Sequence, residues 1–137
     1  MWWIYALLSA LFAALTAIFA KVGIKGVDTD LATAIRTVII LVLAWAIAIF
    51  RGGIHSMAAL SKQNLLFLVL SGVATGLSWI FYFKALQLGK VSQVAPVDKM
   101  SVAIAIILAV VFLGESLSMK SALGALLIIG GTLVLIF

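Results

Sequence analysis

The chain has 137 residues, of which 66% are hydrophobic and only 9% are charged. A soluble domain of this size needs a polar exterior, because much of its surface stays in water, so this composition excludes a water-soluble fold and indicates an integral membrane protein in a lipid bilayer. The net charge of +5 comes from Lys and Arg residues scattered singly between apolar runs, and this scatter excludes a basic patch for nucleic acid.

Apolar runs long enough to cross a bilayer follow one another along the chain. A helix needs about 20 residues to cross a hydrocarbon core of about 30 Å. The five runs of this length are Trp2–Ala20, Leu31–Phe50, Leu65–Leu86, Val94–Leu113 and Leu117–Phe137. The sequence therefore predicts an all-α, polytopic membrane protein with five transmembrane helices.

The connections between the predicted helices are short, at residues 21–30, 51–64, 87–93 and 114–116. They leave no room for an extramembrane domain, and no repeat is visible inside the chain. We therefore expect a single domain over residues 1–137, with its function inside the membrane. The first run is expected to remain a mature helix, because no basic residue precedes it and no small-residue cleavage site follows it.

An odd number of spans places the two termini on opposite faces of the membrane. The loop cations are Arg51, Lys62 and Lys120 on the N-terminal face, and Lys21, Lys25 and Lys90 on the other. Because the two faces carry equal numbers of loop cations, the positive-inside rule favours neither orientation of the chain. Two explanations stay open: cations inside the spans fix one orientation, or the chain inserts both ways and pairs antiparallel.

Charged residues inside the predicted spans need a reason, because each costs about 2.5 to 3.5 kcal/mol at the bilayer centre. They are Arg36, Lys84, Asp98 and Lys99. Counting 1.5 Å per residue places all of them roughly 6 to 8 Å from one membrane face. Such a layer, with one acid and three bases, favours an anionic or zwitterionic small-molecule partner. The structural alternatives are that Lys84 snorkels to headgroups and that Arg36 pairs with Asp98.

Pro96, Asp98 and Lys99 stand close together near the start of the fourth run. The side chains of Asp98 and Lys99 are adjacent on a helix, so they are expected to diverge by about 100°. Pro96 is tolerated near a helix start capped by Ser92, whereas a deeper position would free a carbonyl for a ligand or water. Both placements of the proline stay open.

The third run carries a stripe of hydroxyl groups and two glycines. Ser71, Thr75, Ser78 and Tyr82 follow the spacing i, i+4, i+7 and i+11, which is one face of a helix, and Trp79 stands beside them. The stripe either joins helices or lines a polar pathway. Close helix packing is predicted at Gly72, Gly76, Gly124 and Gly131.

No group of residues has the pattern of a catalytic or metal site. The single histidine, His55, lies in a loop, cysteine is absent, and no glycine-rich phosphate loop precedes a helix. We therefore expect no enzyme, no metal and no cofactor.

A pattern of short motifs resembles a known transporter family. The motif residues are Tyr82, Ala85-Leu86, Gly89, Val94-Ala95-Pro96-Val97, Leu113-Gly114-Glu115, Gly124-Ala125-Leu126-Leu127-Ile128 and Gly130-Gly131. They resemble the EamA-type domain of the drug/metabolite transporter superfamily, in its five-span bacterial and archaeal branch. The resemblance runs the whole length of the chain, and Arg36 fits a basic residue that is often seen early in the second helix.

The resemblance implies a secondary transporter of small metabolites or drug-like solutes, often as export, in the prokaryotic cell (inner) membrane. Larger relatives fuse two such domains in inverted orientation, so this chain corresponds to one half of a ten-helix inverted repeat. It is then expected to act as an antiparallel homodimer with alternating access. Arg36 would bind an anionic group, Asp98 would pair with it or carry a proton, and the hydroxyl stripe with Trp79 would shape the pathway.

Two departures from the family pattern bear on the chemistry. Asp98 and Lys99 stand where members commonly have small or hydroxyl residues. The small multidrug exporters of the superfamily use an acidic residue in the first helix, and Trp2–Ala20 contains none. Two alternatives to a homodimeric transporter remain: a non-transporting scaffold or accessory subunit, and one half of a heterodimer.

Overall fold

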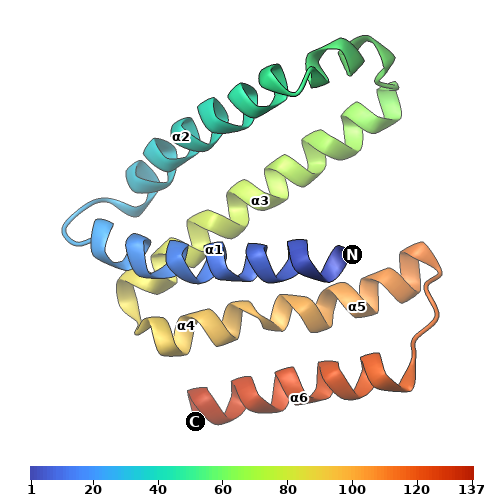
Figure 1. The fold of residues 1–137 in the computed structure, drawn as a ribbon. Coiled ribbons are helices and arrows are strands. Elements are labelled where there is room, and N and C mark those ends of the chain that lie inside the picture. The colour runs from blue at the N-terminus through green and yellow to red at the C-terminus, as the bar shows by residue number, and fades with distance from the viewer. The chain divides into compact units, whose positions relative to one another are not determined.

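The computed structural model describes every residue from Met1 to Phe137 and contains helices but no strands (Figure 1). The elements are α1 (Trp2–Gly23), α2 (Thr29–Phe50), the 3-10 helix η1 (Gly53–Ala59), α3 (Lys62–Leu88), α4 (Val91–Asp98), α5 (Met100–Leu113) and α6 (Met119–Ile136). Five segments are long and apolar enough to cross a membrane, and α4 with α5 makes up one of them, Val91–Leu113. The prediction of an all-α protein with five transmembrane helices is confirmed.

Local hydrogen bonds set the ends of the helices. Asp28 is the N-cap of α2, where its Oδ1 accepts the backbone N–H groups of Asp30 and Leu31, both at 3.0 Å. Ser118 caps α6 by accepting the backbone N–H of Ser121 at 3.0 Å. These caps start α2 slightly earlier and α6 slightly later than the apolar runs predict. Hydropathy does not register a capping side chain.

Two further boundaries differ from the prediction. The helix before the Pro96 region begins at Val91 with Lys90 as its N-cap residue, so Ser92 lies inside the first turn and the predicted Ser92 cap is wrong. The loop that follows α2 contains η1, which is too short and irregular for a periodicity argument to find.

The helices gather into two compact units. The first unit contains residues 1–18 of α1 together with residues 88–137, and the second contains residues 19–87. In the first unit α6 packs against both α4 and α5, and it runs antiparallel to them (Figure 1). In the second unit α2 and α3 run antiparallel and are joined by η1 (Figure 1). The single domain expected over residues 1–137 stays a prediction.

Polar contacts tie the end of α3 to the turn between α1 and α2 within the second unit. The Lys21 ammonium donates a hydrogen bond to the carbonyl of Leu86, one of the last carbonyls of α3. Gln87 Nε2 donates to the carbonyl of Val27 at 3.1 Å. A cation at a helix C-terminus satisfies carbonyls that have no partner within the helix. This end of the second unit is therefore held by side chains as well as by packing.

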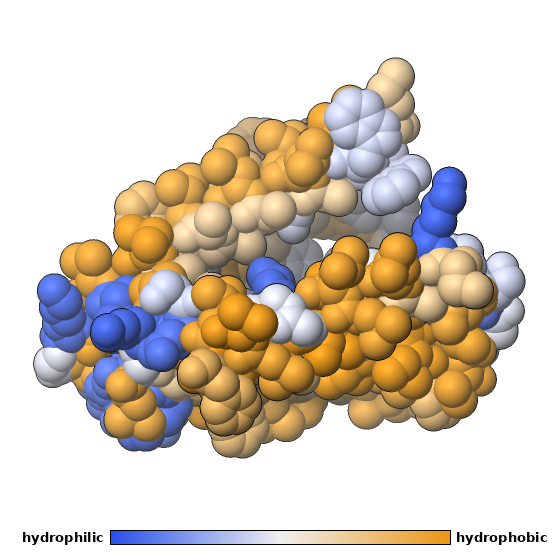
Figure 2. Space-filling view, turned by 90° about the horizontal axis from the view of Figure 1, so that it is seen from below, coloured by the Kyte–Doolittle hydropathy of each residue, from blue (hydrophilic) through white to orange (hydrophobic).

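Most of the apolar surface lies outside the chain's own core. Between 0 and 11% of the residues in the most apolar stretch of each span are buried inside the protein. Hydrophobic residues make up most of the surface in Figure 2, and hydrophilic ones are few. Exposing this surface to water would cost about 25 cal/mol per Å². The chain is therefore an integral membrane protein, and lipid or another protein covers its helices.

Candidate functional site

The guanidinium of Arg36 packs on two aromatic rings in the second unit. Arg36 lies in the second turn of α2, and its Cζ is 4.2 Å from the ring centroid of Phe83 and 5.6 Å from that of Trp79 on α3. Trp79 and Phe83 are one helical turn apart, so their side chains lie on one face of α3. Both distances are within the roughly 6 Å over which a cation is attracted to a ring face. The rings orient the guanidinium without neutralising its charge.

One nitrogen of this guanidinium has no hydrogen-bond partner. Nη1 of Arg36 is buried and unpaired. The threonines that share its stripe of α2 are engaged with their own helix: Thr33 Oγ1 donates to the carbonyl of Thr29, and Thr37 Oγ1 donates to that of Thr33, both at 2.8 Å. A buried donor without an acceptor costs about 1 to 3 kcal/mol. A carboxylate or phosphate oxygen from outside the chain would remove this cost through a charge-assisted hydrogen bond.

The structure brings three of the predicted site residues together and adds a fourth. Tyr82 interacts electrostatically with Arg36, and its ring centroid is 5.8 Å from that of Phe83. Phe83, with 1% of its surface exposed, is the ring closest to Arg36, yet the sequence analysis did not place it in the site. The signal was present, because Trp79 and Phe83 have the i, i+4 spacing of an aromatic pair on α3. A binding role for Arg36, Trp79 and Tyr82 remains our prediction.

The hydroxyl stripe of α3 lies beside this aromatic pair. Ser71, Thr75 and Ser78 are exposed, and Thr75 Oγ1 donates to the carbonyl of Ser71 at 2.9 Å within α3. At about 100° per residue, the stripe is centred roughly 90° around the helix from Trp79 and Phe83. The rings that contact Arg36 therefore flank the stripe, and Tyr82 belongs to the stripe while it also approaches Arg36. The polar pathway along Ser71, Thr75 and Ser78 is still an expectation.

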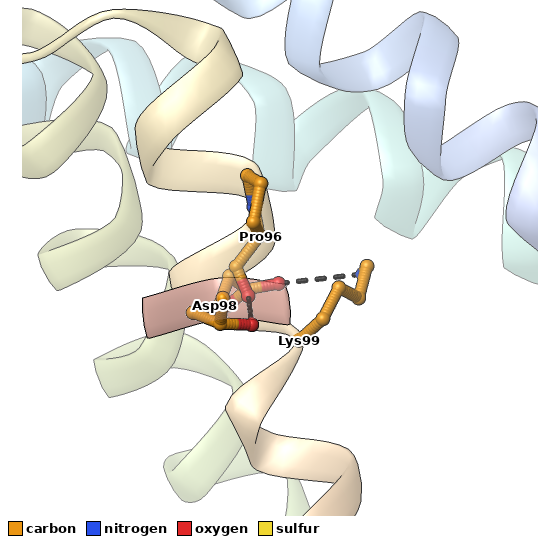
Figure 3. A network of polar contacts seen from close by, with 4 residues as sticks. Pro96, Asp98 and Lys99 are labelled. Atoms are coloured by element: carbon orange, nitrogen blue, oxygen red, sulfur yellow. Dashed lines mark hydrogen bonds and ion pairs between the residues drawn. The ribbon is translucent and has the colours of Figure 1, made fainter. Parts of the chain in front are cut away.

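Asp98 and Lys99 form an ion pair at a break in the fourth span (Figure 3). Lys99 separates α4 from α5, and its Nζ is 3.4 Å from Asp98 Oδ2. The expectation that the two side chains diverge is wrong at their tips, because four methylene groups let the ammonium return to the neighbouring carboxylate. The pair is partly open, with side-chain exposures of 56% for Lys99 and 34% for Asp98. Their roles in coupling or binding stay predictions.

Pro96 lies inside α4, close to the break. Because Pro96 has no N–H, the carbonyl of Ser92 loses its usual helical donor. The Pro96 carbonyl accepts the backbone N–H of Lys99 at 3.0 Å. The Thr132 hydroxyl of α6 shares its hydrogen between the Pro96 carbonyl at 3.1 Å and the carbonyl of Ile128 in its own helix at 2.8 Å. In Figure 3 Pro96, Asp98 and Lys99 surround this turn. The structure therefore favours the deeper placement of the proline, and Thr132, which is buried, closes the turn against α6.

The predicted Arg36 to Asp98 pair joins residues of different units and stays a prediction, as does the layer of all four charges. Within the second unit Lys84 is exposed. No group of three or more His, Cys, Asp or Glu residues is placed to hold a metal ion.

The glycines assigned to helix packing face open space. No neighbouring atom lies within 4 Å of the place where a Cβ would stand on Gly72, Gly76, Gly124 or Gly131. No helix of the chain's own units therefore packs closely on them. A packing role at these positions would need a partner outside the chain, and it stays a prediction.

Comparisons with known proteins show which family the chain belongs to. The sequence profile described as the EamA-like transporter family matches residues 1–137. The chain is 48% identical over 134 residues to a protein of Sinorhizobium sp. described as "Uncharacterized transporter in cobO 3'region", and the match covers 98% of this chain and 95% of that protein. No solved structure matches. Five apolar spans, a family profile over the whole chain and a relative of nearly equal length lead to one conclusion: the chain belongs to the EamA-like transporter family.

Proposed function

We propose that this protein is a secondary transporter that carries a small solute with an anionic group across the membrane and binds that group at Arg36. The observation that supports the proposal most is the buried, unpaired Nη1 of Arg36, whose guanidinium rests on Phe83 and Trp79. Aromatic faces attract a cation but accept no strong hydrogen bond from its N–H groups. The charge and the donor are therefore both available to a carboxylate or a phosphate.

The chemistry of arginine suits this task inside a membrane. Its guanidinium stays charged, loses hydration more readily than an ammonium and offers planar N–H donors to a carboxylate. The ring contacts hold the donor in place before the solute arrives, so little side-chain entropy is lost on binding. The hydroxyls of Ser71, Thr75, Ser78 and Tyr82 on α3 would then contact the rest of a metabolite or drug-like solute. Zwitterionic solutes fit the same reasoning, and Asp98 would carry a coupling proton.

We further propose that the protein works as an antiparallel homodimer with alternating access. Each copy then supplies one half of an inverted repeat. Three observations support this dimer: the number of spans is odd, the loop cations on the two faces are equal, and the helices bury little of their own surface.

The chain contains no cysteine, so one engineered thiol at Ser116 would be its only labelling site. A membrane-impermeant maleimide is expected to label about half of the copies in intact cells, as dual insertion requires. Labelling of all copies, or of none, would refute dual insertion.

Export from a prokaryotic cell across its inner membrane is the direction that the family favours.

Ligand binding and flux test the proposal. Purified protein is screened by thermal shift against monocarboxylates, amino acids and phosphate esters, and the compounds that raise the melting temperature are then assayed for flux in proteoliposomes. Arg36→Gln is expected to abolish the shift and the flux. Arg36→Lys should weaken binding about tenfold, because lysine keeps the charge but not the planar donor set.

Arg51→Gln is the matched control, because Arg51 is the only other arginine and lies just beyond the end of α2. It should leave both readouts unchanged. If no compound shifts the melting temperature and Arg36→Gln only destabilises the protein, a scaffold or accessory subunit replaces the transporter as the explanation. If binding requires a second, different chain, the protein is instead one half of a heterodimer.

A further inference from the structure

A groove between α5 and α6 lies in the first unit, whereas Arg36 belongs to the second. Its volume is about 350 Å³. Residues of α5, of the α5–α6 loop and of α6 line it: Val102, Ala105, Ile106, Ala109, Val110, Glu115, Ser116, Leu117 and Ser121. The α5 residues follow the i, i+3, i+4, i+7 spacing of one helix face. Ala105 and Ala109 are the small residues of this helix face.

The stretch of α5 from the first lining residue to the end of the helix is about as long as one leaflet of a bilayer is thick. From Val102 to Leu113, where α5 ends, the helix rises about 16 Å. This is close to half of a hydrocarbon core of about 30 Å. A transmembrane helix of a second copy would be expected to contact the whole span, whereas a single lipid chain reaches from the surface to the bilayer centre. The dimensions therefore favour a lipid as the occupant.

The polar end of the groove lies at the surface loop. Gly114, with a φ of +67°, ends α5 in the left-handed conformation that glycine adopts without strain, and the next residue is Glu115. The side chain of Glu115 is exposed and forms no ion pair, unlike Asp98. An apolar groove that ends at an unpaired carboxylate is complementary to an amphiphile with an apolar tail and an ammonium head.

A basic residue stands next to the same end. Lys120 lies in the first turn of α6, beside Ser121, which lines the groove. Lys120 forms no ion pair with Glu115. A phospholipid headgroup with a terminal ammonium carries a phosphate as well. Lys120 does not line the groove, so Glu115 is the one charged side chain of the lining.

We infer that the α5–α6 groove binds one phospholipid with a primary-ammonium headgroup, whose acyl chain lies along Ala105 and Ala109 and whose ammonium pairs with Glu115. A primary ammonium donates three hydrogen bonds to a carboxylate, whereas a trimethylated ammonium donates none. The groove therefore selects phosphatidylethanolamine over phosphatidylcholine. The selection requires no transported solute, so it is independent of the function proposed above.

Lipid retention measured by native mass spectrometry tests this inference. The full chain is released from nanodiscs made of equal parts of dioleoyl phosphatidylethanolamine, phosphatidylcholine and phosphatidylglycerol. The unmodified protein is expected to retain phosphatidylethanolamine several-fold more than either competitor. Glu115→Gln should remove this preference, and Asp30→Asn, which changes an exposed carboxylate in the first turn of α2, should keep it.

A second variant separates a lipid from a protein occupant. Ala109→Phe fills the groove and is expected to reduce retention of phosphatidylethanolamine while the oligomeric state stays the same. Equal retention of the three lipids by the unmodified protein would overturn the inference, as would a preference that survives Glu115→Gln. A loss of dimer in Ala109→Phe without a change in lipid retention would also overturn it, because the occupant would then be a second copy.

Discussion

Arg36 and Lys99 are both cations within transmembrane segments, but their surroundings differ. Lys99 is half exposed and lies 3.4 Å from the carboxylate of its neighbour Asp98. Arg36 has no carboxylate in its contacts and rests on the faces of Phe83 and Trp79, with one nitrogen buried and unpaired. An adjacent acid neutralises a cation locally, whereas aromatic rings stabilise it and leave its charge unbalanced. Of the two cations, Arg36 is therefore the one free to attract an anion.

The largest effect on this comparison is expected from the ring that supports Arg36. Phe83→Ala removes a buried side chain and should lower the unfolding free energy by about 3 kcal/mol, whereas Phe83→Leu keeps most of the burial and should cost about 1 kcal/mol through the lost cation–π contact. Thermal unfolding in a fixed lipid mixture measures both. Phe81→Leu is the control on the same helix, because Phe81 is 71% exposed. Equal effects at Phe81 and Phe83 would break the comparison.

A smaller effect is expected at the turn that precedes Lys99. Thr132→Val removes the hydroxyl that donates to the Pro96 carbonyl, and it should cost about 0.6 kcal/mol, the average for such bonds between membrane helices. Thr75→Val is the matched change, because the Thr75 hydroxyl donates only within its own helix. It should leave the melting temperature unchanged. If the two variants behave alike, the Thr132 bond does not hold the turn against α6.

The smallest effect is expected from the ion pair itself. Asp98→Asn leaves Lys99 without its partner and should cost about 0.2 to 0.5 kcal/mol, because the pair is partly exposed. Adding Lys99→Gln should restore the loss in a thermal melt. A double variant that regains stability but loses flux would instead assign the carboxylate of Asp98 to proton coupling, and the two cations would then differ less than the structure indicates.

The sequence was sufficient for the spans, and it singled out Arg36 as a charge inside a span whose binding role stays a prediction. Runs of apolar residues reveal membrane helices directly, and a cation inside a span is conspicuous because its cost in lipid is high. The helix ends were less predictable, since Asp28 and Ser118 act through single hydrogen bonds that leave hydropathy unchanged. The sequence did not decide whether the helix breaks at Lys99, because a proline near a helix end can lie in the first turn or deeper inside the helix.

The contacts of the site could not be predicted in the same way. The i, i+4 spacing of Trp79 and Phe83 marks an aromatic pair, but only the approach of α2 to α3 makes Phe83 the nearest ring to Arg36. The ion pair of Asp98 and Lys99 depends on the conformation of a long side chain, which helical geometry does not fix. The contact of the Thr132 hydroxyl with the Pro96 carbonyl joins two helices, so the spacing of residues along α6 does not reveal it.

The low self-burial of the five spans has a thermodynamic consequence. Whatever covers the helices binds the folded state, so each lipid, detergent or neighbouring protein raises the melting temperature by mass action according to its concentration and affinity. The unfolding temperature of this protein is then a property of the chain together with its solvent. Variants are comparable only at one lipid composition and one protein-to-lipid ratio, and titrating that ratio becomes a measurement of how the helices are covered.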